Sequence, residues 1–308
     1  MKNFIFYAAT VLIWGSTWIG IKLQLGSVAP VVSVMYRFGL ASSILLVWCK
    51  VSGLNLRFGM KDHGFMALLG MLLFGFNYLL FYMAELHLAS GLAAVIFSLI
   101  LPMNMINGVI FLKKPIDGCV VVGGILGLTG IILVFRPEIS SFSLDNDGLL
   151  GVVLSLAATL LASLGNITSA YNQKRGLPIV QTNGYGMGYG AIIMLVSALI
   201  FGQPFGFEFS VVYVGSLFYL ALFGSVVAFG CYLTLVGNIG ADRAAYATLL
   251  FPIVALAIST VWEDYRWTRS AVTGVGLIML GNIWMLQRQK RIMPKKQFAQ
   301  SKEKVVRT

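Results

Sequence analysis

Residues 89–112 read ASGLAAVIFSLILPMNMINGVIFL, a run of more than 20 residues without one charged side chain. A helix needs about 20 mostly apolar residues to cross the hydrocarbon core of a bilayer, so this run predicts a membrane-spanning helix. Pro102 lies near its middle. Proline lacks the N–H that would bond the carbonyl four residues back, here that of Ser98. We therefore expect an interrupted helix near the bilayer midplane, where irregular backbone is stable inside protein or beside a water-filled cavity.

The composition extends this interpretation to the whole chain. Of the 308 residues, 58% are hydrophobic and 11% are charged, and the mean hydropathy is +0.86. A soluble domain carries about 25% charged residues. Nine further apolar segments of similar length follow one another with short loops between them. We therefore expect an all-α polytopic membrane protein with ten transmembrane helices.

The basic residues predict an orientation. Eight of the 22 Lys and Arg residues lie in the basic tail 288–308, which we expect to bind anionic lipids. No folded nucleic-acid-binding module accompanies the tail, so we expect no nucleic-acid partner. With the N-terminus inside, 17 basic residues fall on the inner side and four on the outer side, namely Lys22, Arg136, Arg266 and Arg269. This bias predicts that both termini are cytoplasmic.

The sequence repeats itself at a spacing of 150 residues. The matching pairs are Gly26 and Gly176, Tyr82 and Tyr232, Ser98 and Thr248, and Pro102 and Pro252. After one inserted residue, Gly123 and Gly130 match Gly274 and Gly281. Five helices per copy is an odd number, so the second copy must enter the membrane inverted, as in many secondary transporters.

Two inverted five-helix repeats therefore define the expected domains. They are a first repeat over 1–137, an outer-side linker over 138–147, a second repeat over 148–287 and the tail 288–308. The glycine-rich strings at 123–130 and 184–190 lie inside predicted helices, and such strings favour close helix packing in membranes.

Four motifs resemble a known family. They are IWGSTWIGIK (13–22), VMYRFGLAS (34–42), ASGLAAVIFSLILPM (89–103) and AAYATLLFPIVALAISTVWED (244–264). These motifs and the layout are similar to the EamA-type repeats of the drug/metabolite transporter superfamily. The resemblance implies a metabolite carrier of the bacterial inner membrane, with the first, third, fourth, sixth, eighth and ninth helices around a central cavity. The family often has a glutamate after the proline helix of both repeats; Glu263 matches in the second, whereas Lys113 takes that place in the first.

Aromatic and polar residues at membrane depth are the predicted lining of the cavity, because such a lining suits amphipathic or cationic organic compounds. They are Trp14, Trp18, Asn77, Tyr78, Tyr82, Ser98, Tyr232, Tyr246 and Thr248. The alternative for Trp18 and Tyr82 is a place in the interfacial aromatic belt. Pro102 and Pro252 are the predicted hinges, and simple packing kinks are the alternative.

Three charged residues are further candidates. Arg37 is the one charge well inside a predicted span, where it either binds an anion or another helix, or extends toward the outer interface. Glu85 and Glu263 lie at outer helix ends, where they either carry protons or are solvated. No carboxylate lies at mid-membrane, which favours exchange or facilitated diffusion over proton coupling.

These features predict a secondary transporter, not an enzyme. We expect alternating access and export or exchange of a small organic metabolite, such as an amino acid, an amino-acid derivative or an amphipathic compound. The sequence has no P-loop motif, which disfavours a primary pump, and we expect no cofactor and no metal. A passive channel or facilitator is the alternative. A membrane-embedded enzyme is less favoured, because no nucleophile or acid–base cluster is evident. Both a monomer and a homodimer fit the sequence.

Overall fold

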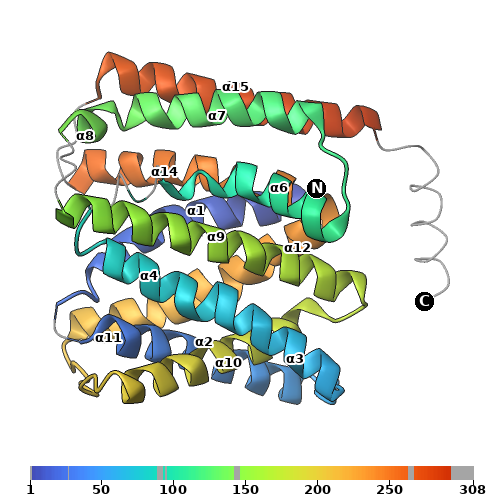
Figure 1. The fold of residues 1–308 in the computed structure, drawn as a ribbon, viewed down its shortest axis with the longest axis vertical. Helices are drawn as coiled ribbons and strands as arrows, with labels where there is room; N and C mark the ends of the chain where they lie inside the picture. The colour runs from blue at the N-terminus through green and yellow to red at the C-terminus, as the bar shows by residue number, and fades with distance from the viewer. Residues whose placement is uncertain are drawn as a thin grey trace.

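The computed structural model describes residues 2–26, 28–88, 93, 96–141, 146–262 and 267–292, and all regular structure within them is helical (Figure 1). Up to residue 141 the elements are α1 (Lys2–Lys22), α2 (Pro30–Val51), α3 (Met60–Leu69), the π-helix η1 (Gly70–Phe76), α4 (Asn77–Ala84), α6 (Ile100–Leu112), α7 (Gly118–Val134) and α8 (Arg136–Ser141). Beyond it they are α9 (Asn146–Lys174), α10 (Ile179–Ile200), α11 (Val211–Tyr219), the π-helix η2 (Leu220–Val227), α12 (Ala228–Ile239), α13 (Ala241–Ala244), α14 (Tyr246–Trp262) and α15 (Arg269–Ile292).

Six helical stretches among the described residues are long and apolar enough to cross a membrane. They are Lys2–Lys22, Pro30–Val51, Met60–Ala84, Gly148–Lys174, Ile179–Ile200 and Val211–Ile239. Many large apolar side chains point out of the bundle, such as Ile125 on α7 and Leu199 on α10. A water-soluble protein avoids such broad apolar surfaces, whereas lipid accepts them. The fold is therefore that of a multi-pass membrane protein, as the composition predicts.

The helices run side by side between two ends of the bundle (Figure 1). We call one end the N-terminal side. It holds the start of α1 and the end of α12, which are joined by a 2.9 Å hydrogen bond from Asn238 Nδ2 to Asn3 Oδ1. The other end is the far side, where α1 ends at Lys22 and α4 ends at Ala84.

Glycines bring helices into backbone contact at two places, between α7 and α15 and between α10 and η1. The helices α7 and α15 pack along each other, as do α2 and α10 (Figure 1), and α10 also packs against η1. A Cβ atom on Gly130 would lie 2.5 Å from the carbonyl oxygen of Gly274, and one on Gly190 would lie 3.1 Å from that of Gly70. Only glycine permits such an approach. The predicted close packing of both glycine strings is confirmed.

Two local features recur at the spacing seen in the sequence. The π-helices begin at Gly70 and Leu220, and each interrupts a long apolar helix. Gly26 and Gly176 follow α1 and α9, with φ angles of 120° and 84°. Glycine adopts positive φ without the steric cost of a Cβ, so it suits both turns.

The two prolines affect their helices differently. The backbone turns at Ser98 and Leu99, and α6 begins at Ile100, so Pro102 lies in its first turn. The Ser98 carbonyl accepts a 3.3 Å bond from the Leu101 N–H, three residues on. The interruption expected before Pro102 is thus confirmed. At Pro252 the α14 backbone is helical from Tyr246 to Trp262, so the turn seen before Pro102 has no counterpart there. Proline removes one bond, and the neighbouring bonds of a helix can bridge the loss.

Candidate functional site

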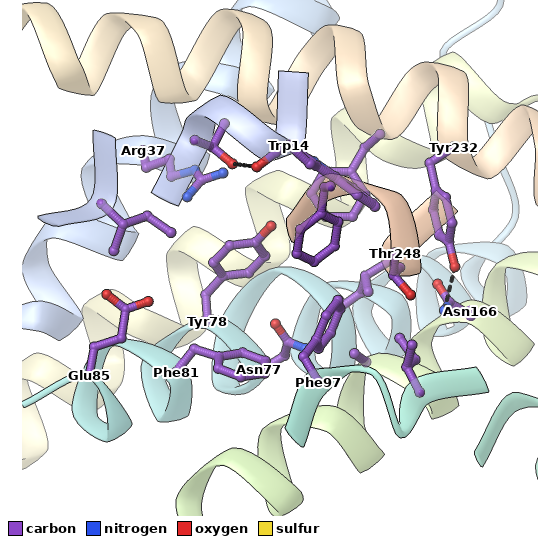
Figure 2. A pocket seen from close by; sticks show the side chains of 17 residues that line it. Trp14, Arg37, Asn77, Tyr78, Phe81, Glu85, Phe97, Asn166, Tyr232 and Thr248 are labelled. Carbon is purple, nitrogen blue, oxygen red and sulfur yellow. Dashed lines mark hydrogen bonds between the residues drawn. The ribbon is translucent and has the colours of Figure 1, made fainter. Parts of the chain in front are cut away.

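A cavity of about 680 Å³, including its part open to solvent, lies in the middle of the bundle (Figure 2). Its described lining residues are Trp14, Thr17, Ile21, Arg37, Leu73, Asn77, Tyr78, Phe81, Glu85, Phe97, Ile100, Ala162, Asn166, Phe229, Tyr232, Thr248 and Phe251. They come from the six helices that the family resemblance implied, and α2 adds Arg37.

Seven of the predicted site residues line this cavity. They are Trp14, Asn77, Tyr78, Tyr232 and Thr248, together with the charged candidates Arg37 and Glu85 (Figure 2). The helix faces of α1, α4, α12 and α14 therefore converge as the aromatic pattern predicts. Whether these residues contact a substrate stays a prediction.

Three predicted lining residues are buried elsewhere. The Tyr82 hydroxyl donates a 3.1 Å bond to Gln24 Oε1, and the Tyr246 hydroxyl donates a 2.6 Å bond to the Val120 carbonyl. Ser98 is 1% exposed in the turn before α6. None of the three is part of the cavity wall. These positions favour packing roles, because each buried hydroxyl needs a local partner.

Three other candidates fall outside what the structure describes. The side chains of Trp18 and Pro252 are not described, and Glu263 lies between the described ranges 146–262 and 267–292. Their predicted roles in the cavity, in a hinge and at the outer helix end stay predictions. Pro102, the other predicted hinge, is partly buried.

Arg37 is enclosed within the bundle. Its side chain is 1% exposed, so the interpretation that it extends to the interface is wrong. Its Nε donates a 3.0 Å bond to Ser225 Oγ, and its guanidinium carbon lies 4.6 Å from the centre of the Tyr78 ring. Nη1 has no hydrogen-bond partner, and no described carboxylate forms an ion pair with Arg37. A buried charge normally requires such a partner.

Glu85 lies one residue beyond the candidate span that ends at Ala84, on the far side. Its Oε1 is buried without a hydrogen-bond partner. Burial raises the pKa of the Glu85 carboxyl to about 8, although the Lys22 charge partly opposes this. Figure 2 shows Glu85 and Arg37 toward the same end of the cavity, on opposite walls in that view. At neutral pH this end is therefore net positive, because Glu85 is largely protonated.

Aromatic rings and amides form the deep end of the cavity. The Trp14 ring lies 5.0 Å from that of Phe229 and 4.9 Å from that of Tyr232, centre to centre. Asn166 Nδ2 donates a 3.0 Å bond to the Tyr232 hydroxyl, whereas Asn166 Oδ1 has no partner. Asn77 Nδ2 donates a 3.0 Å bond to the Ala158 carbonyl. These bonds fix the wall and leave one free acceptor, Asn166 Oδ1, on a side chain that lines the cavity.

Contacts between distant parts of the chain close the N-terminal side. Arg243 on α13 forms an ion pair with Asp117, the residue before α7. Asn104 Nδ2 donates a 3.1 Å bond to the Ala241 carbonyl. Burial alone would raise the pKa of Asp117, but hydrogen bonds from Arg243 and from the Cys119 N–H hold it below its usual range. The carboxylate therefore stays charged and paired at neutral pH.

A second, smaller hollow lies at this closed side. It measures about 320 Å³ and is lined by residues that include Asn104, Lys114, Asp117, Ile167 and Asp242. The sequence analysis does not identify the Asp117–Arg243 pair, because its partners lie 126 residues apart. Thr17, Phe97, Phe229 and Phe251 are also missing from the predicted lining, since their residue types alone do not distinguish a cavity wall from a core.

The geometry of the cavity suits the binding of an organic molecule. Within the described part of the chain, no group of three or more His, Cys, Asp or Glu residues is placed to bind a metal ion. The cavity wall carries one guanidinium, one carboxyl group, amides and aromatic rings. Such a wall can hold an organic molecule by its apolar surface and by a few polar contacts.

Comparison with known proteins decides the family. The profile of the EamA-like transporter family matches residues 1–136 and 149–287. The chain belongs to the EamA-like transporter family.

Three similar proteins have names that describe transporters or an efflux pump. An uncharacterized transporter of Archaeoglobus fulgidus is 26% identical, with 94% of this chain and all of that protein aligned. A probable amino-acid metabolite efflux pump of Escherichia coli is 26% identical over 94% of this chain and 98% of its own. The uncharacterized inner membrane transporter YedA of Escherichia coli is 26% identical over 82% and 80%. A solved structure with 14% identity has a TM-score of 0.76 and covers 95% of this chain and 99% of its own, which supports the fold.

Proposed function

We propose that this EamA-like protein is a secondary transporter that moves a small organic metabolite by alternating access. The observation that carries the proposal is the pair of separate hollows, one toward each end of the bundle. The larger cavity extends from Glu85 toward Tyr232, and the smaller hollow lies at the N-terminal side, where Asn104 and Asp117 line it and Arg243 pairs with Asp117. A carrier needs one site that faces each side in turn. The described conformation then corresponds to the state open toward the far side.

The chain is proposed to consist of two inverted five-helix repeats, residues 1–137 and 148–287. The family profile matches the chain twice, and the π-helices and turn glycines recur at the same spacing. The packing is also reciprocal: α2 pairs with α10, α7 pairs with α15, and the α1–α14 contact has its counterpart in α9–α6. Exchanging the conformations of two such halves converts one open state into the other, which is how the mechanism follows from the symmetry.

The ten-helix layout and the orientation belong to the same proposal. The basic residues favour an N-terminal side that faces the cytoplasm, with the tail 288–308 on the same side near anionic lipids. The far-side cavity then opens away from the cytoplasm, as in the outward-facing state of an exporter or exchanger. An amino acid, an amino-acid derivative or another amphipathic compound is the proposed substrate class. One relative's name, a probable amino-acid metabolite efflux pump, supports it.

Counterflow in proteoliposomes tests the function. An untargeted metabolite comparison of cells with and without the protein first supplies candidate substrates. We expect uptake of the labelled candidate to saturate and to accelerate when unlabelled candidate is present inside the liposomes. Saturation without acceleration would favour a simple facilitator, and neither property would indicate a channel. Liposomes with and without the protein that take up every candidate equally would refute transport.

A further inference from the structure

Arg37 offers more hydrogen-bond donors than the bundle uses. A guanidinium carries five N–H donors in a fixed plane. Its Nε bonds Ser225 Oγ, and its flat face covers the ring of Tyr78, but Nη1 is without a partner on a side chain that is 1% exposed. No described carboxylate pairs with it. Because Arg37 also lines the cavity, a negatively charged group inside the cavity would supply the missing partner.

We propose that Arg37 anchors the carboxylate of the transported compound, and that the aromatic wall holds an apolar body about the size of a phenyl ring. The inference rests on the proposed function, because it names the substrate class of the same cavity. Trp14, Phe97 and Phe229 are among the residues that provide the apolar wall (Figure 2). An arginine and a carboxylate can form two parallel hydrogen bonds, which fixes the position as well as the charge of the ligand.

The same contacts argue against an organic cation and against a highly charged anion. The Tyr78 ring, which would otherwise attract a cationic ligand, already has the Arg37 guanidinium over it. Arg37 is the one basic side chain among the described residues that line the cavity, so it matches a single negative charge. A phosphate monoester carries up to two negative charges and would leave one of them unpaired in a largely apolar site.

Binding to the purified full-length protein in detergent tests the proposal. The probes share a phenyl group and differ in charge: 3-phenylpropionate, 3-phenylpropanamide and 2-phenylethylamine. Trp14 lies in the wall, so quenching of tryptophan fluorescence and thermal stabilisation report binding. We expect 3-phenylpropionate to bind at least about tenfold more tightly than the amide, because a charge-assisted hydrogen bond is much stronger than a neutral one. Equal binding of acid and amide, preference for the amine, or no binding of any probe would overturn the proposal.

Variants identify the side chain that causes the preference. Arg37→Gln removes the charge and should reduce the acid-to-amide ratio to about one, whereas Arg37→Lys should retain part of it. Arg175→Gln is the matched control, because Arg175 pairs with Asp62 on the surface, outside both hollows. A ratio unchanged in Arg37→Gln would overturn the assignment.

If Arg37→Gln does not fold, the comparison of acid and amide binding to the wild-type protein still tests whether the cavity prefers a carboxylate. The outcome is also independent of the transport test. Selective binding of the acid without counterflow would refute the transport function but support Arg37 as the carboxylate anchor. Counterflow without selective binding would support transport but refute the role of Arg37.

Discussion

Removing the Asp117–Arg243 ion pair should shift the protein toward the state open to the N-terminal side. Asp117→Asn is the sharpest perturbation, because asparagine keeps an oxygen that can accept the Cys119 N–H and cap α7. The substitution removes the charge that holds Arg243. Under the proposed mechanism this pair is made in the described conformation and must break when the N-terminal side opens. Its loss therefore destabilises one state and not the other.

The magnitude follows from the environment of the pair. A hydrogen bond between charged groups contributes about 1.5–3 kcal/mol when it is shielded from water. Both side chains are 22% exposed, so solvent reduces the contribution to about 1–2 kcal/mol. That energy changes the ratio of the two states by about 5- to 30-fold.

Cysteine labelling measures the shift. Thr248→Cys places a thiol in the cavity wall, after Cys49, Cys119 and Cys231 are replaced by serine. In membrane vesicles we expect Asp117→Asn to accelerate labelling by an impermeant reagent applied from the N-terminal side by about 5- to 30-fold. Labelling from the far side should slow if the described state was only partly populated, and otherwise stay near its original rate.

A second ion pair provides the control. Asp62 pairs with Arg175 on the same side of the bundle, with 24% and 25% exposure, but borders neither hollow. Asp62→Asn should leave the labelling rates from both sides unchanged. Unchanged rates in Asp117→Asn, faster labelling from both sides, or the same shift in Asp62→Asn would refute the assignment of the Asp117 pair as a lock.

Three further results are expected. Gly130→Ala should destabilise the protein by about 1–3 kcal/mol in thermal unfolding, because its Cβ would lie 2.5 Å from the Gly274 carbonyl oxygen, whereas Gly276→Ala, with open space around it, should not. Pro102→Ala should reduce transport more than membrane abundance; equal loss of both would assign the proline to folding instead. Binding of 3-phenylpropionate should weaken several-fold between about pH 6.5 and pH 9, because Glu85, with its pKa raised to about 8 by burial, is neutral at the lower pH and repels a carboxylate at the higher one. Glu85→Gln should remove that dependence, and an identical pH profile in wild type and Glu85→Gln would contradict it.

The helical membrane fold follows from the sequence because lipid imposes strong rules on it. Long uncharged runs must be helical, and glycine strings permit close packing, so both expectations hold at 123–130 and 184–190. The positive φ angles at Gly26 and Gly176 agree with the repeat spacing as well. These features depend on local sequence, so they can be predicted without knowledge of contacts between distant segments.

The site was predicted less completely, because its geometry depends on contacts between distant segments. Tyr82 and Tyr232 match in the repeat, yet only Tyr232 lines the cavity, since Gln24 provides Tyr82 with another partner. From the sequence, Arg37 either binds an anion or another helix, or extends toward the outer interface. Its burial in the bundle favours the first interpretation. No local sequence pattern indicates the Asp117–Arg243 ion pair, because its partners lie 126 residues apart.

The two π-helices have a consequence for how the protein tolerates changes in length. A π-helical segment accommodates an extra residue within a continuous helix. One residue corresponds to about 100° of rotation in an α-helix, so a length change in an α-helical part of these spans turns the faces of α4 and α12. A one-codon deletion within 70–76 or 220–227 instead converts the π-helix into α-helix, and Asn77 and Tyr78, or Phe229 and Tyr232, keep facing the cavity. In this protein, single-residue deletions should therefore be tolerated better in these two segments than in the α-helical parts of the same spans.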